Sequence, residues 1–280
     1  MPIGFFAEES FPGGIAYHAA MPYVVPAGDA QIETIAEGRG PLVVILPSRG
    51  RGARDYDEVA RRIARGGYRV LRPQPRGIGR SKGPMRGLTL HDLARDVAAV
   101  IAHAEAGPAL LVGHAFGNWV ARMTAADFPR LVRGVAILAA AAKEYPAALA
   151  EAVTKCADLS LSDAERLKYL QYAFFAPGHD ASEWLEGFYP EVNATQRAAG
   201  LATPQDAWWG AGAAPLLDLQ AEHDAFRPRA TAGDLREEFG ERVSVALVTD
   251  AGHALVPEQP KAVALALLAW MKKLPAKKRA

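Results

Sequence analysis

Short apolar runs and helix-like segments alternate along most of this chain, and this alternation constrains its fold more than any other feature. Runs typical of buried strands occupy residues 41–47, 68–73, 109–113, 132–140, 214–220 and 242–248. Segments with apolar residues at helical spacing lie at 55–67, at 89–104, from 114 to about 128 and at 260–274. The pattern predicts an α/β fold, in which a mostly parallel, doubly wound sheet carries helices on both faces.

The first 40 residues follow a different pattern. Two stretches, IAYHAAMPYVV at 15–25 and AQIETIAEG at 30–38, are separated by the turn-forming sequence PAGD. Such a pair predicts an N-terminal antiparallel hairpin that opens the sheet.

Residues 143–212 interrupt the alternation, because they contain no predicted strand and many aromatic residues. Within them, residues 161–175 read as a helix with Ser162 as its N-cap. We expect 143–212 to be a helical lid above the carboxyl edge of the sheet, where ligands bind in open α/β folds. The remaining residues, 1–142 and 213–280, would then form the core domain. Of the aromatic residues, Trp184, Phe188 and Trp209 are predicted to contact substrate, with packing inside the insertion as the alternative for each.

The sequence Gly113-His114-Ala115-Phe116-Gly117 follows the third run of the alternating series and precedes a helix. With serine in place of Ala115 it would be G-x-S-x-G, the nucleophile elbow of serine hydrolases. The two glycines suit a turn too sharp for neighbouring side chains. His114 is expected to pack under this turn as a structural residue.

Together with the elbow, further segments in matching order resemble the α/β-hydrolase fold family over essentially the whole chain. They are LPSRGRG at 46–52, PRGIGRSKGP at 75–84, QAEHDAFRP at 220–228 and DAGHALVPEQP at 250–260. The family's order of nucleophile, acid and histidine implies Ala115, Asp224 and His253 for these roles. The loop at 46–52 departs from the His-Gly sequence usual in the family.

The resemblance also implies a role for each of these residues. Asp224 would orient His253 and stabilise its imidazolium form. The oxyanion hole would consist of the backbone N–H of Phe116, at the start of a helix, and that of Arg49. Ser48, beside Arg49, is predicted to contact substrate.

Three interpretations of Ala115 remain open. First, it is an engineered replacement for a serine nucleophile in a hydrolase of esters, thioesters, lactones or amides. Second, it is natural, and His253 with Asp224 acts as a general base in a lyase, a cofactor-free oxygenase or a non-covalent hydrolase. In that case Arg49, Arg51 or Arg76 would be able to bind a carboxylate substrate. Third, the chain binds a small ligand without catalysis.

Composition limits the partners that we expect. The 280 residues carry a net charge of only +1, which gives no reason to expect nucleic acid or a membrane as partner. No signal peptide or membrane span is predicted, so we expect a cytoplasmic protein. The single cysteine, Cys156, excludes an internal disulfide, and no residue spacing predicts a metal or cofactor site. The resemblance and the aromatic residues of the predicted lid together imply a small, moderately apolar carbonyl compound as ligand; the oligomeric state is not predicted.

Overall fold

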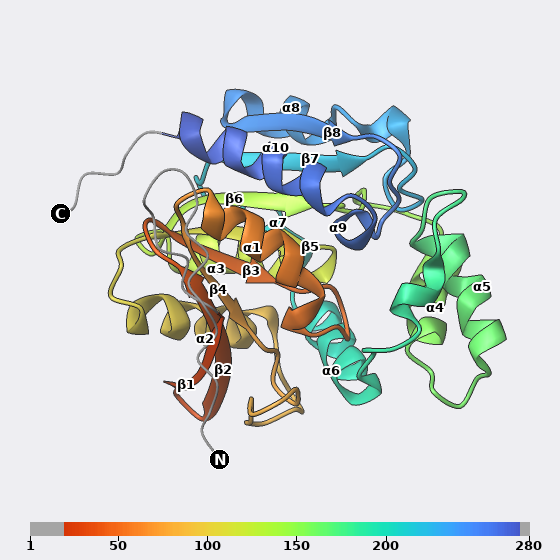
Figure 1. Cartoon of the computed structure of the whole chain (residues 1–280), viewed down its shortest axis with the longest axis horizontal. Helices are drawn as coiled ribbons and strands as arrows, with labels where there is room; N and C mark the ends of the chain where they lie inside the picture. Colours follow the sequence, from red (N-terminus) through yellow and green to blue (C-terminus); the bar gives the residue numbers. More distant parts are fainter. Residues whose placement is uncertain (1–19, 275–280) are drawn as a thin grey trace, which may run out of the picture.

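A computed structural model of the chain describes residues 20–274 and contains one eight-stranded sheet (Figure 1). The order of its strands is β1-β2-β4-β3-β5-β6-β7-β8. Their bounds are Met21–Ala27 (β1), Ala30–Gly38 (β2), Leu42–Leu46 (β3), Arg69–Pro73 (β4), Ala109–His114 (β5), Val132–Leu138 (β6), Leu216–Ala221 (β7) and Val243–Val248 (β8). This architecture confirms the fold that the sequence predicts.

The N-terminal hairpin is the antiparallel part of the sheet. Strand β1 pairs with β2, and β2 pairs with β4, both antiparallel. All further pairs, from β4 through β3 to β8, are parallel. Residues 15–19 of the predicted first strand lie outside the described part of the chain. The parallel strands all end at one edge of the sheet, so the loops that follow β3, β5, β7 and β8 meet there.

Helices cover both faces of the sheet. One apolar cluster joins helix α1 (Asp57–Arg65) and helix α10 (Pro260–Lys273) to one face. A second cluster joins helix α2 (Leu90–His103) and helix α3 (Phe116–Asp127) to the other face. Both faces of the central strands are therefore buried, which is why β3 and β5 read as continuous apolar runs. Shorter helices complete the C-terminal half: η3 (Arg229–Thr231), α8 (Asp234–Phe239), η4 (Gly240–Arg242) and α9 (Leu255–Glu258).

The segment between β6 and β7 is helical. It contains α4 (Ala147–Cys156), α5 (Asp163–Ala173), the 3-10 helix η2 (Ala181–Trp184), α6 (Pro190–Leu201) and α7 (Gln205–Trp209). Helices α4 and α5 lie side by side beyond the edge of the sheet, drawn in green at the right of Figure 1. They belong to an apolar cluster that includes Leu149, Cys156 and Leu170, Trp184 of η2, and Phe226 and Ala254 of the loops after β7 and β8. The lid role of this segment stays a prediction.

Candidate active site

A sharp turn at Ala115 connects β5 directly to α3. Ala115 has φ +48° and ψ −115°, a conformation that non-glycine residues rarely adopt. A Cβ added to Gly113 would lie 2.4 Å from the carbonyl oxygen of Gly117, and one added to Gly117 would lie 2.3 Å from that of Leu46. Glycine is therefore required at both positions, and this packing holds Ala115 in its strained conformation.

Asp224 and His253 form a buried pair at the same edge of the sheet. Nδ1 of His253 lies 2.9 Å from Oδ1 and 3.1 Å from Oδ2 of Asp224. Oδ1 also accepts a hydrogen bond from the backbone N–H of Phe226 (2.9 Å), which fixes the carboxylate. Because the carboxylate accepts from Nδ1–H, Nε2 is the ring nitrogen left to take up a proton. The structure thus brings together the two residues that the sequence assigns as acid and histidine.

Contacts that the sequence does not signal hold the His253 loop in place. Glu258 accepts hydrogen bonds from the N–H groups of Gly252 (2.7 Å) and Ala176 (2.6 Å), and burial raises the pKa of its carboxyl group. The ring of Phe226 lies 4.2 Å from that of His253, measured between centroids, and the ring of Phe174 lies at 5.4 Å. The imidazole is therefore confined between two aromatic rings.

Most backbone N–H groups in the loop after β3 are already paired. The pairs are Ser48 with the Tyr56 hydroxyl (2.9 Å), Gly50 with Oε1 of Gln196 (2.7 Å) and Arg51 with the carbonyl of Ser48 (3.1 Å). The N–H groups of Arg49 and Phe116 have no hydrogen-bond acceptor among residues 20–274. These two are the donors that the sequence assigns to an oxyanion hole.

His114, beside the elbow, connects three loops through a buried network. Its Nε2 lies 2.7 Å from the carbonyl oxygen of His253, and its Nδ1 lies 2.8 Å from the hydroxyl of Tyr56. Burial lowers the pKa of His114 to about 3, so the ring is neutral at pH 7. Since a carbonyl oxygen only accepts, Nε2 carries the proton and Nδ1 accepts from Tyr56. Tyr56 is a site residue that no sequence motif indicates.

One cavity collects most of the predicted site residues. Ser48, Arg49, Ala115, Phe116 and His253 all line it. Its other lining residues are Trp119, Ala141, Tyr145, Val153, Phe174 and Phe226. The cavity has a volume of about 50 Å³, enough for a few water molecules or a small acyl group.

The three aromatic residues predicted to contact substrate do not line this cavity. The rings of Trp184 and Phe188 lie on the guanidinium of Arg51, which is 4.6 and 4.5 Å from their centroids. Trp209 stacks on Arg122 and donates from Nε1 to Glu238 (2.9 Å). These side chains pack against residues outside 143–212, and their contact with substrate stays a prediction.

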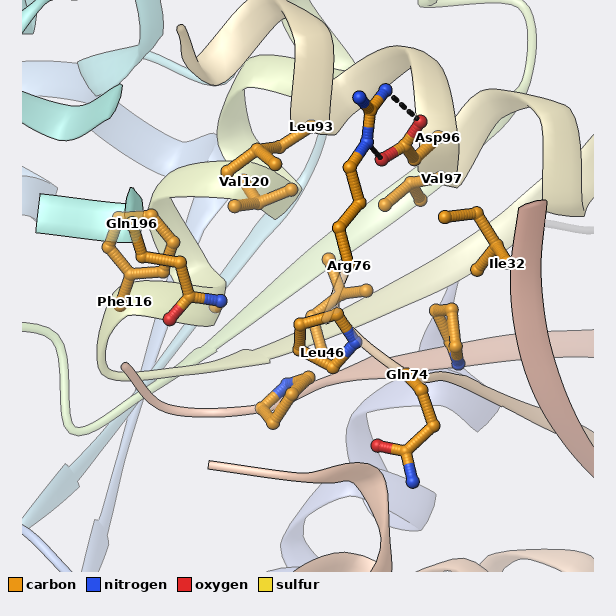
Figure 2. A pocket seen from close by; sticks show the side chains of 14 residues that line it. Ile32, Leu46, Gln74, Arg76, Leu93, Asp96, Val97, Phe116, Val120 and Gln196 are labelled. Carbon is orange, nitrogen blue, oxygen red and sulfur yellow. Dashed lines mark hydrogen bonds and ion pairs between the residues drawn. The ribbon is translucent and has the colours of Figure 1, made fainter. Parts of the chain in front are cut away.

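A second, largely apolar cavity lies on the other side of Phe116 (Figure 2). Leu46, Leu93, Val97 and Val120 are among its lining residues, whereas Ala115 and His253 are not. Arg76 lines it too, and its guanidinium pairs with Asp96 (2.7 and 2.9 Å), as the dashed lines in Figure 2 show. This cavity contains no candidate acid or base other than that neutralised pair.

Residues 20–274 hold no group of three or more His, Cys, Asp or Glu side chains suited to a metal ion. Within the same range, no helix has both the length and the apolar character needed to cross a bilayer.

Comparison with known proteins identifies the family to which this chain belongs. A model described as "Alpha/beta hydrolase family" matches residues 43–267. The "Pyrrolizixenacetamide deacetylase" of Xenorhabdus hominickii is 31% identical over 117 residues, which cover 41% of this chain and only 44% of that protein. The "Putative carbamate hydrolase RutD" of Variovorax paradoxus is 27% identical over 77% of this chain and 85% of its own. The solved structure of an esterase from Exiguobacterium antarcticum superimposes with a TM-score of 0.75 at 18% identity, over 90% of this chain and all of the esterase, a likeness of fold.

Proposed function

Because the chain belongs to the α/β hydrolase family, we propose that it hydrolyses a small carbonyl compound by activating water directly, without an acyl-enzyme. The observation that carries the proposal is the convergence of groups on one cavity: His253, held by Asp224, and the unpaired N–H groups of Phe116 and Arg49. A base and two donors around one space are the minimum for hydrolysis of a carbonyl group.

The reaction takes place in two steps. Nε2 of His253 removes a proton from water while the water oxygen bonds to the carbonyl carbon, and the carbonyl oxygen becomes an oxyanion. The N–H groups of Phe116 and Arg49 donate to that oxyanion. The intermediate then breaks its bond to the leaving oxygen or nitrogen, which takes the proton from Nε2. The products are a carboxylic acid and an alcohol or amine, and Asp224 stabilises the imidazolium between the steps.

Ala115 determines that water is the nucleophile in this mechanism. A methyl group offers no attacking atom, and it leaves open the space that a serine hydroxyl would fill. The strained elbow still orients the first turn of α3 so that the N–H of Phe116 points toward the reacting carbonyl group. We expect a lower rate than that of a serine hydrolase, because the nucleophile is a mobile water molecule and not a side chain fixed beside the carbonyl carbon.

The names of the relatives suggest which bonds to test. The deacetylase and carbamate hydrolase relatives are named for reactions at carbonyl groups bonded to nitrogen or oxygen. In this chain Ser48 offers a hydroxyl to such a substrate, and residues 143–212 act as its lid. Tyr145, Val153 and Phe174 of that segment supply apolar lining, which favours a moderately apolar acyl group.

The test compares the chain with His253→Ala on a panel of p-nitrophenyl acetate, an acetamide and a methyl carbamate. We expect slow turnover without an initial burst, no acylated protein by mass spectrometry, and a loss of about 10²–10⁴-fold in His253→Ala. His253→Gln and thermal unfolding of each variant control for loss of fold. Equal turnover in chain and variants would remove His253 from the mechanism and overturn the proposal.

A further inference from the structure

The side chain of Arg49 places an unpaired cation at the candidate active site. Its Nε and Nη2 atoms are buried and have no hydrogen-bond partner in the described part of the chain. Arg49 lines the same cavity as Ala115 and His253. A buried donor that lacks an acceptor costs free energy, so a buried guanidinium is normally paired.

The other two arginines that the sequence places near the site are paired. Arg51 donates to Asp55 (2.6 Å) and to the carbonyls of Trp184 (3.1 Å) and Glu186 (2.6 Å). Arg76 is held by Asp96, as described above. Of the three candidates for carboxylate binding, Arg49 alone is without a hydrogen-bonded side-chain partner among residues 20–274, whereas Arg51 and Arg76 each pair with a carboxylate.

No acidic side chain compensates the charge of Arg49 in the cavity. The residues that line it include no Asp or Glu. Burial lowers the pKa of Arg49 to about 10, and Tyr145, Arg197 and Cys156 are the groups that act on it electrostatically. At pH 7 the guanidinium is therefore charged, and none of the described residues that line the cavity supplies a carboxylate for it.

We propose that Arg49 binds a carboxylate group of the substrate, so that the substrate is a carbonyl compound carrying an acid a few bonds from the reacting carbon. This inference rests on the proposed function, because it concerns the same cavity. The backbone N–H of Arg49 donates to the oxyanion, while its guanidinium, at the wall of the same cavity, pairs with the carboxylate. One residue thus fixes the spacing between the acid and the carbonyl group.

A second positive charge acts on Arg49. Arg197, which is exposed in a groove between α4 and α6, interacts with Arg49 electrostatically. The groove also has one acid, Asp158, whose carboxylate already accepts from Ser160. The positive potential that Arg197 adds at Arg49 favours an anionic ligand there.

Binding tests the proposal independently of catalysis. Butyrate and its uncharged counterpart butyramide are titrated into the chain, Arg49→Met and Arg54→Met by calorimetry. Arg54 is exposed, follows the same loop, and serves as matched control. We expect butyrate to bind at least about tenfold more tightly than butyramide, and this ratio to fall to about one in Arg49→Met only. A ratio near one in the unmodified chain, or one that Arg49→Met leaves unchanged, overturns the proposal.

Kinetics separate this proposal from the hydrolytic one. Monomethyl glutarate and methyl glutaramate have the same length and differ in carrying a carboxylate or an amide. We expect kcat/KM to favour the glutarate at least about tenfold, Arg49→Met to abolish the preference and Arg49→Lys to restore part of it. Hydrolysis of both esters at equal rates overturns the carboxylate site and leaves the hydrolase. If neither ester is hydrolysed while butyrate binding still depends on Arg49, the hydrolase fails and the carboxylate site stands.

Discussion

The hydroxyl of Tyr56 donates to Nδ1 of His114 across 2.8 Å, although the two residues are 58 positions apart in the chain. Through this bond the loop after β3, the elbow and the His253 loop are fixed to one another, because Tyr56 also accepts from Ser48 and His114 donates to the carbonyl of His253. The network requires a neutral His114, which makes the stability of the protein dependent on pH.

We predict that stability is lost as the pH falls below about 6.5. The pKa of His114 is about 3 in the folded protein and 6.5 in its ordinary state. Between these values the unfolded chain binds a proton that the folded chain does not, so the free energy of unfolding falls by up to about 1.4 kcal/mol per pH unit. His114→Gln has no imidazole to titrate at this position. Its free energy of unfolding, measured with urea from pH 7.5 to 4.5, should therefore fall less steeply with pH. Parallel pH profiles for the two proteins would contradict the prediction.

Ala115→Ser should convert the site to covalent catalysis. Serine fits the same backbone conformation with one added hydroxyl group, which Nε2 of His253 can deprotonate. We expect p-nitrophenyl acetate hydrolysis to rise by at least about 100-fold, with an initial burst and an acylated protein in mass spectra. The double variant with His253→Ala is the control and should lose the burst. If the single variant shows neither burst nor adduct, the base and the oxyanion donors do not converge on position 115.

Asp224→Asn should lower turnover by about two to four orders of magnitude while binding of butyramide stays within a few-fold. An amide at this position favours the wrong tautomer of His253 and does not stabilise its imidazolium form. Steady-state kinetics on the best substrate of the panel, beside the exposed-residue control Asp206→Asn, measures the effect. Turnover within a few-fold of the unmodified chain would mean that another group orients His253.

Arg49→Met should stabilise the fold even though it removes carboxylate binding. Two of its donor atoms, Nε and Nη2, are buried without a partner, so an apolar side chain of similar length relieves a desolvation cost. We expect the free energy of unfolding to rise by on the order of 1 kcal/mol, and the Tm with it. Binding of butyrate should reduce the difference, because the ligand stabilises only the protein that carries Arg49. A lower Tm for Arg49→Met would indicate that the arginine serves the fold instead.

The sequence by itself determined the sheet, its antiparallel opening and the elbow. These features depend on local patterns: apolar runs that are buried on both faces, a turn at PAGD, and glycines where a Cβ would meet the backbone. Several predicted strands are shorter in the structure; β6, predicted over 132–140, ends at Leu138 before Ala139, which has φ +47°. Asp224 and His253 were indicated by the resemblance of their loops, in matching order, to the α/β-hydrolase family.

Only the tertiary structure decided which groups are free to act. Whether a donor is unpaired depends on partners far away in the chain, such as Tyr56 and Gln196 for the loop after β3. The same holds for the arginines, since Asp55 and Asp96 neutralise Arg51 and Arg76 while nothing described neutralises Arg49. Trp184, Phe188 and Trp209 do not line the cavity, and Trp184 and Trp209 lie against arginines, since a large ring is also suited to burial against a guanidinium; their contact with substrate stays a prediction. Hydrogen bonds and ion pairs between distant residues carry no local sequence signal, so they appear only once the chain is folded.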